Sequence, residues 1–256
     1  MPLLELGNKH QVHYQLIPGQ QNKPYLVFLH EGLGSVALWK DFPASLCTAT
    51  GHPGLVYDRL GHGKSSSLEH KRSIRYMHEC ALQELPLLLK MLIPEKDYIL
   101  IGHSDGGSIS LIYGAEHPAR LKGIITEAAH VFVEQETLAG IHDAVAAWDK
   151  GQLAGLHKYH GSKTVTLFNA WAETWLAEWF RNWSIDELLP RLQVPLLVLQ
   201  GADDQYGTKK QVNTIVSSAS GEAWGEMVPN CGHTPHLEAQ PFVLDRMAQF
   251  IRQITG

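Results

Sequence analysis

Tyr98-Ile-Leu-Ile-Gly-His-Ser-Asp-Gly-Gly107 begins as an apolar run and then breaks into the pattern Gly-x-Ser-x-Gly at residues 102–106. A glycine at each end lets the chain reverse sharply and holds Ser104 out of the sheet that the apolar run enters. The small and apolar residues 106–111 favour a helix that packs closely behind this strand, and the amides at its N-terminus attract negative charge. The pattern alone also occurs in ordinary turns, but here both flanks fit, so chemistry on a carbonyl group is the first functional hypothesis.

Composition sets limits on the class of protein. The chain has 256 residues, 44% of them hydrophobic and 18% charged, which is enough to bury a full core as one domain with an insertion. A net charge of -5 without basic runs argues against nucleic acid as a partner. The N-terminal residues lack a signal-peptide pattern and no segment is long enough to span a bilayer, so we expect a cytoplasmic protein without a membrane partner.

Three cysteines, Cys47, Cys80 and Cys231, are odd in number and widely spaced. This spacing predicts neither a disulfide framework nor a zinc cluster. We expect buried, reduced thiols.

Short apolar runs alternate with longer, helix-like stretches along most of the chain. Leu3–Leu6 and Gln11–Leu16, separated by Gly7-Asn8-Lys9, predict an antiparallel hairpin. The alternation after it predicts an α/β fold with a mostly parallel, doubly wound sheet of about eight strands. The further runs are 25–29, 54–57, 98–101, 123–126 and 195–199.

One long segment without such runs is rich in tryptophan, and we interpret it as a helical cap inserted into the core. The predicted domains are a core of residues 1–130 and 190–256 and a cap of residues 131–189. Pro190 is expected to end the last cap helix. Four tryptophans recur every fourth residue, at Trp171, Trp175, Trp179 and Trp183, and are predicted to lie along one side of a helix. They either pack this helix against the core or, for Trp171 and Trp175, form part of a substrate pocket.

A serine hydroxyl attacks a carbonyl poorly unless a base removes its proton, and the base needs an acid to orient it. The apolar run 195–199 leads through Gly201 to Asp203 and Asp204, which would stand at the carboxyl end of a strand. Near the C-terminus, His233 and His236 lie on a predicted loop before the final helix.

These motifs resemble those of the α/β-hydrolase superfamily, in which the nucleophile, acid and histidine follow one another in this order. The resemblance covers nearly the whole chain outside the cap. It implies Ser104 as nucleophile, Asp204 rather than Asp203 as acid, and His233 rather than His236 as base. Glu127, at the end of the preceding predicted strand, is a rival acid, because some members of the superfamily use that position.

Residues 27–34 resemble the His-Gly loop of the superfamily, which supplies one amide to the oxyanion hole. The resemblance implies Gly32 as this donor and the amide of Asp105 as the second. Glu31 stands where the family usually has glycine. Residues 57–65 resemble the family's Asp-x-x-Gly-x-Gly-x-Ser turn, which implies structural roles for its polar residues Asp58, Arg59 and His62.

The side chain of Asp105 has two interpretations. It either stabilises the N-terminus of the helix through the helix dipole, or it places a carboxylate beside the acyl pocket and disfavours anionic substrates.

The fifteen histidines also raise the question of a metal site. The closest pairs are His157 with His160 and His233 with His236, and neither pair has a third ligand at suitable spacing. Neither a metal nor a cofactor is therefore predicted.

The predicted function is hydrolysis of a small carboxylic ester through an acyl-enzyme intermediate, with a small molecule as partner. A carbon-carbon bond hydrolase of the meta-cleavage type and an amide or aminoacyl-ester hydrolase remain alternatives, because one triad serves all of these reactions. A non-catalytic ligand receptor built on the same fold is an alternative of another class. The sequence leaves the oligomeric state open.

Overall fold

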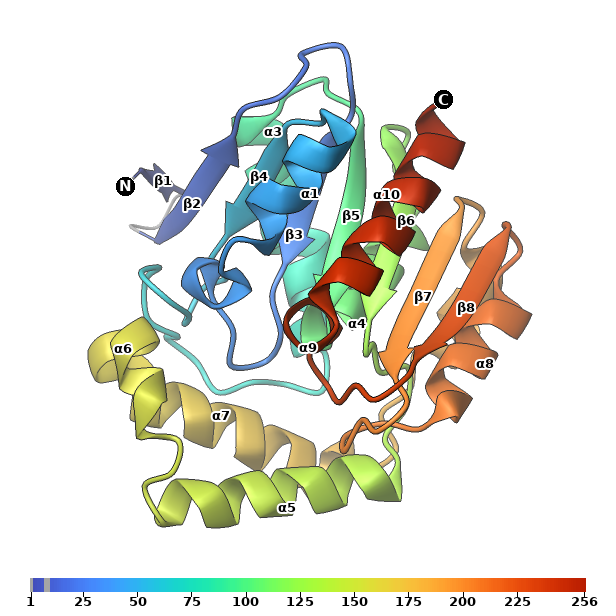
Figure 1. The fold of residues 1–256 in the computed structure, drawn as a ribbon. Helices are drawn as coiled ribbons and strands as arrows, with labels where there is room; N and C mark the ends of the chain where they lie inside the picture. The colour runs from blue at the N-terminus through green and yellow to red at the C-terminus, as the bar shows by residue number, and fades with distance from the viewer. Residues whose placement is uncertain (1, 7–9) are drawn as a thin grey trace.

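The computed structural model describes residues 2–6 and 10–256. Within these ranges, eight strands form one sheet in the order β1-β2-β4-β3-β5-β6-β7-β8 (Figure 1). The strands are β1 (Leu3–Glu5), β2 (Gln11–Ile17), β3 (Tyr25–Leu29), β4 (Gly54–Tyr57), β5 (Tyr98–His103), β6 (Leu121–Glu127), β7 (Leu196–Gly201) and β8 (Ala223–Val228).

The sheet is mainly parallel. β2 pairs antiparallel with β1 and with β4, whereas every pairing from β4 across to β8 is parallel. Parallel neighbours need crossover connections, which place helices over both faces of the sheet. The predicted α/β class and the mostly parallel, doubly wound sheet are confirmed, as is the antiparallel pairing of the N-terminal hairpin. Its predicted turn, Gly7-Asn8-Lys9, lies outside the described residues.

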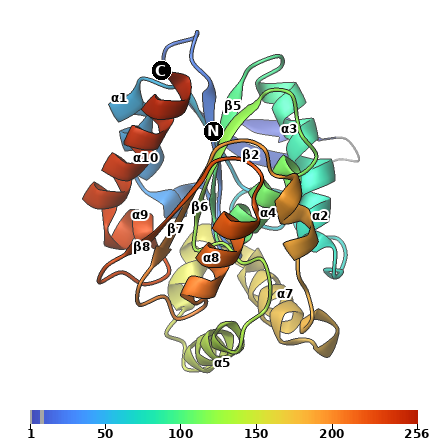
Figure 2. The same ribbon diagram turned by 90° about the vertical axis from the view of Figure 1, so that its right-hand side faces the viewer.

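Helices cover both faces of the sheet. Figure 2 shows α1 and α10 on one face and α3, α4 and α8 on the other. The α-helices are α1 (Phe42–Thr50), α2 (Tyr76–Glu79), α3 (Leu85–Leu92), α4 (Asp105–Gly114), α5 (Gln135–Asp149), α6 (His157–His160), α7 (Thr164–Leu176), α8 (Lys209–Ser218), α9 (Pro235–Glu238) and α10 (Gln240–Thr255). Short 3-10 or π-helical turns lie at η1 (Val36–Trp39), η2 (Cys80–Glu84), η3 (Ala154–Leu156), η4 (Gly161–Lys163), η5 (Glu178–Phe180) and η6 (Asp186–Arg191).

The core has two layers because side chains alternate between the faces of each strand. In β3, Leu26 and Phe28 pack with α1 and α10, whereas Val27 and Leu29 pack with α3 and α4. The strand is therefore apolar along its whole length, as expected for a sheet buried on both sides. Because β3, β5, β6 and β7 pair in parallel, their carboxyl ends lie at one edge of the sheet.

The segment 131–189 lies across that edge, with α5, α6 and α7 below the sheet in Figure 1. Its two ends are neighbours, since Phe132 and Ser184 form an antiparallel bridge and the amide of Ile185 donates to the carbonyl of Val131 over 2.8 Å. An insertion whose ends meet can be accommodated without disturbing the sheet.

The prediction that four tryptophans share one side of a helix is wrong. α7 ends at Leu176, so only Trp171 and Trp175 lie on it. Trp183 comes after the turn and packs back on Trp175, with ring centroids 5.8 Å apart, while Trp179 is half exposed. Burial of aromatic rings against one another outweighs the helical periodicity of the sequence, because a continued helix would leave Trp183 unable to reach Trp175.

Pro190 does not end a cap α-helix as expected, because it lies inside the 3-10 segment η6. None of the apolar runs in the sequence corresponds to the strand β8. It is an edge strand with mostly half-buried side chains and a central Gly225, so it lacks the apolar run that marks the inner strands.

None of the helices in the described part of the chain has both the length and the apolar character of a transmembrane segment. The three cysteines are free, and Cys47 and Cys231 are buried, whereas Cys80 is partly exposed.

Candidate active site

Ser104 lies at the sharp turn between β5 and α4. Its backbone has φ 51° and ψ -116°, a region that residues with a side chain rarely adopt. The turn is possible because the chain passes very close to its neighbours: a Cβ on Gly106 would lie 2.0 Å from the carbonyl oxygen of Leu29, and one on Gly102 would lie 2.2 Å from that of Gly106. Strain of this kind persists only where the surrounding packing enforces it, and it is common at active sites.

We expect Gly106→Ala to lower the melting temperature strongly, because its methyl group would overlap the backbone of β3, which cannot move without disturbing the sheet. Gly155→Ala is the matched control, since no atom lies within 4 Å of its added methyl group. Thermal unfolding followed by circular dichroism compares the two variants. Equal melting temperatures would show that the turn does not depend on this close approach.

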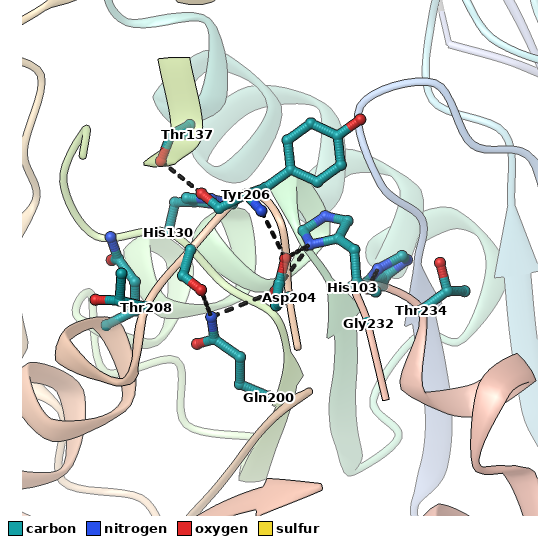
Figure 3. A network of polar contacts seen from close by, with 12 residues as sticks. His103, His130, Thr137, Gln200, Asp204, Tyr206, Thr208, Gly232 and Thr234 are labelled. Atoms are coloured by element: carbon teal, nitrogen blue, oxygen red, sulfur yellow. Dashed lines mark hydrogen bonds and ion pairs between the residues drawn. The ribbon is translucent and has the colours of Figure 1, made fainter. Parts of the chain in front are cut away.

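Asp204 and His233 meet on the side of the site formed by β7 and the loop after β8. Nδ1 of His233 lies 2.9 Å from Oδ1 and 3.0 Å from Oδ2 of Asp204. Figure 3 shows Asp204 between Tyr206 and Gln200. The amide of Tyr206 donates to Oδ1 over 2.8 Å, and Gln200 Nε2 donates to Oδ2 over 3.3 Å. Burial alone would raise the pKa of Asp204, but the hydrogen bond and charge of His233 outweigh it and lower this pKa. A carboxylate held in this way orients the imidazole ring.

Ser104 and His233 line the same cavity, which has a volume of about 270 Å³. No hydrogen bond joins their side chains among the residues that the structure describes. The core contributes polar groups to this cavity, including Glu31 and Asp105. The 131–189 segment contributes a largely apolar wall: Thr137, Ile141, Ala144, Leu153, Leu156, Trp171 and Trp175.

The loop after β3 presents the amide of Gly32. The carbonyl oxygen of Glu31 accepts hydrogen bonds from His30 Nδ1 at 2.7 Å, Arg59 Nη2 at 2.7 Å and the amide of Gly34 at 3.0 Å. In a trans peptide the N–H points opposite to the carbonyl, so these bonds turn the Gly32 N–H away from Arg59. Within the described ranges, the Gly32 amide has no protein acceptor and is free to bind an oxyanion.

The amide of Asp105 is arranged in the same way. The carbonyl of Ser104 accepts hydrogen bonds from the amides of Gly107 and Ser108, at 2.8 and 3.1 Å, and therefore points along α4. The N–H of Asp105 points in the opposite direction, out of the N-terminus of the helix. It too lacks an acceptor in the described part of the chain.

The side chain of Asp105 is buried and has partners in the protein. Oδ2 lies 3.7 Å from Arg59 Nη1 and accepts a hydrogen bond from the hydroxyl of Tyr76 over 3.1 Å. Burial opposes the charge on Arg59, but Asp105 outweighs this effect and raises the pKa of the guanidinium. Asp105 thus borders the cavity with a charge that a buried arginine compensates.

The turn after β4 supports the loop that carries Gly32. Asp58 accepts hydrogen bonds from the amides of Val36 and Lys64, at 2.6 and 2.8 Å. Nε2 of His62 lies 3.1 Å from the carbonyl oxygen of Gly32. Together with Arg59, these residues position the loop and lie outside the cavity.

The rival groups lie elsewhere. Glu127 is buried and contacts His236, with Oε2 2.6 Å from Nδ1, and neither residue lines the cavity that contains Ser104. Asp203 is exposed. Both ring nitrogens of His160 are bound by the protein, to the amide of Gly63 and the carbonyl of Leu33, which leaves no lone pair for a metal.

The cavity also contains residues that were not identified as site residues from the sequence, among them Glu31, His130 and Tyr206. His130 Nε2 donates to the carbonyl of Tyr206 over 3.0 Å, and its ring lies 5.9 Å from that of His233. Burial, assisted by the charge of His233, lowers the pKa of His130 and keeps it neutral. The only signal for these positions was the departure from glycine at Glu31.

Trp171 and Trp175 approach the candidate catalytic residues from α7. The indole of Trp171 packs so closely on Gly32 that a Cβ there would lie 2.6 Å from it. Trp175 lies against His130, with ring centroids 5.3 Å apart. α7 thus closes the cavity over the serine turn and the Gly32 loop.

Comparisons with known proteins agree with this geometry. A model of the alpha/beta hydrolase fold family matches residues 24–182. A proline iminopeptidase from Lactobacillus crispatus (strain ST1) is 23% identical over 283 residues, which covers 95% of each chain.

Solved structures show the same fold. The 2-hydroxy-6-oxo-6-phenylhexa-2,4-dienoate hydrolase from Rhodococcus sp. strain RHA1 matches with a TM-score of 0.82 and 16% identity, over 98% of this chain and 97% of the other. The enol-lactonase from Burkholderia xenovorans LB400 matches with a TM-score of 0.75 and 18% identity, over 98% and 100%. These low identities establish a common fold and leave the substrate open.

Proposed function

Because the chain belongs to the alpha/beta hydrolase fold family and is a hydrolase, we propose that it cleaves small carboxylic esters through an acyl-enzyme intermediate. One observation carries this proposal: the Asp204 carboxylate holds His233 on the wall of the cavity that Ser104 lines. This is the combination of nucleophile, base and orienting acid that acyl transfer requires.

In the proposed reaction, Ser104 Oγ attacks the ester carbonyl while His233 takes its proton. The carbonyl oxygen becomes an anion, which the amides of Gly32 and Asp105 stabilise. When the carbon-oxygen bond of the ester breaks, the protonated imidazole gives its proton to the leaving alcohol. Water then attacks the acyl-enzyme with the same histidine as base, releasing the acid and regenerating the serine.

We propose that the 131–189 segment is a cap that excludes water and selects the acyl group. Ile141 and Ala144 of α5, together with Trp171 and Trp175 of α7, offer a compact surface for a short acyl chain. The limited volume of the cavity, about 270 Å³, favours short acyl chains over long ones.

The alternatives differ in the charge of the substrate. A dienoate carries a carboxylate, and no lysine or arginine belongs to the described lining of the cavity, so its charge would meet Glu31 and Asp105 without a cationic partner. Amide hydrolysis stays a second candidate, because the relative from Lactobacillus crispatus is named a proline iminopeptidase.

A substrate panel tests the proposal. We expect release of p-nitrophenol to be fastest with acetyl to butyryl esters and to fall by at least about tenfold at octanoyl, because the apolar wall is short. The panel includes one dienoate and proline p-nitroanilide. A higher kcat/KM on either of these than on any ester would overturn ester hydrolysis, and a ligand response that survives Ser104→Ala without turnover would point to a receptor.

A further inference from the structure

Glu31 places a carboxylate in the candidate active site, in the loop that carries the Gly32 amide. It lines the main cavity together with Ser104 and His233. One of its oxygens, Oε2, accepts a hydrogen bond from the amide of Leu33. Its backbone carbonyl is held by His30, Arg59 and Gly34, so the residue is fixed at the border of the cavity.

The carboxylates of Glu31 and Asp105 differ in whether a neighbouring cation pairs with them. Asp105 has an ion pair with Arg59, whereas no described lysine or arginine forms an ion pair with the carboxylate of Glu31. Burial raises the pKa of Glu31, and the Leu33 amide together with the charges of His233 and Arg59 offsets only part of this effect. The protein therefore leaves the ionised form of Glu31 poorly stabilised, and a cation in the cavity would supply what is missing.

The rest of the cavity also suits a cation. Three aromatic residues line it, Trp171, Trp175 and Tyr206, and aromatic faces attract ammonium groups. A carboxylate near a developing oxyanion hinders the reaction through repulsion, and a cation bound between them removes this repulsion in the transition state. The effect therefore favours catalysis on a cationic substrate as well as its binding.

We infer that Glu31 is a specificity-determining residue that selects substrates with an ammonium group close to the ester carbonyl, as in an ester of a small amino acid. The inference rests on the proposed ester hydrolysis and names its substrate class. The small cavity limits the acyl group to a compact side chain.

A pair of isosteric substrates tests the inference. Benzyl alaninate and benzyl isobutyrate differ by the exchange of an ammonium group for a methyl group, and release of benzyl alcohol measures both reactions. We expect the wild type to prefer the alaninate, and Glu31→Gln to lower kcat/KM on the alaninate by about 10- to 100-fold, the range for loss of a charge-assisted hydrogen bond. Its kcat/KM on the isobutyrate should not fall by more than about threefold and can rise, because the variant no longer repels the developing oxyanion.

Two further variants distinguish loss of the Glu31 carboxylate from a general effect on folding. Glu31→Gly removes the carboxylate and should lose the same selectivity, whereas Glu136→Gln changes an exposed glutamate on α5 and should leave both activities unchanged. A wild type without preference for the alaninate, or a Glu31→Gln variant that lowers both activities equally, overturns the inference.

Binding separates this inference from the proposed function. In the Ser104→Ala background, calorimetry measures the Kd of each ester without turnover. We expect the alaninate to bind about tenfold more tightly than the isobutyrate, and Glu31→Gln to abolish the difference. Equal Kd values overturn the selection of cations even if ester hydrolysis is established, whereas absence of turnover by the wild type on every ester of the panel and on both benzyl esters overturns only the proposed reaction.

Discussion

Ser104→Ala is expected to lower kcat on the best ester of the panel by about 10⁶-fold, since loss of the nucleophile removes the whole acyl-transfer route. The amides of Gly32 and Asp105 would remain in place, because neither depends on the hydroxyl, so weak residual catalysis over water should persist. Steady-state release of p-nitrophenol measures the effect. Ser217→Ala, at an exposed position on α8, is the matched control and should retain full activity.

The same position allows a test of backbone strain. Ser104→Gly also lacks the hydroxyl, but glycine adopts φ 51° readily. We expect its free energy of unfolding to exceed that of Ser104→Ala by about 1 kcal/mol, because the relief of strain outweighs the greater flexibility of the unfolded glycine chain. Urea denaturation measures the difference.

If Ser104→Ala keeps more than about a tenth of the wild-type kcat, Ser104 is not the nucleophile.

Asp204→Asn is expected to lower kcat by about 10⁴-fold, because an amide next to Nδ1 favours the wrong tautomer of His233 and cannot stabilise the imidazolium. The lowered pKa of Asp204 means that the native side chain stays ionised across the weakly acidic and neutral range. The loss should therefore be constant from about pH 6 to 8, which pH profiles of kcat can measure.

Glu127→Gln is the matched comparison for this acid. Glu127 contacts His236, outside the main cavity, so we expect kcat to stay within about tenfold of the wild type even if stability falls. The reverse pattern, a large loss of kcat with Glu127→Gln and a small one with Asp204→Asn, would identify Glu127, at the end of β6, as the acid of the triad.

Local patterns predicted the core of the fold correctly. The apolar runs of β3 and β4 coincide with the observed strands, and β5 leads into the turn at Ser104 and then α4 as expected. These elements are predictable because a strand buried on both faces must be apolar throughout, and because few residues other than glycine tolerate the close approach at 102 and 106. Weak edge patterns, such as that of β8, carry no comparable signal.

The resemblance to the α/β-hydrolase superfamily identified Ser104, Asp204 and His233 as a candidate site, because their order along the chain is that of the family. Contacts between segments that are distant in the sequence could not be predicted from sequence motifs. The compensation of Asp105 by Arg59 joins residues 46 positions apart, and the end of α7 at Leu176 depends on the packing of Trp183 against Trp175. The sequence by itself thus determined the class of the sheet, its inner strands and the residues of the candidate site. The charge balance and lining of the cavity follow from packing, because burial and ion pairing depend on which segments meet in three dimensions.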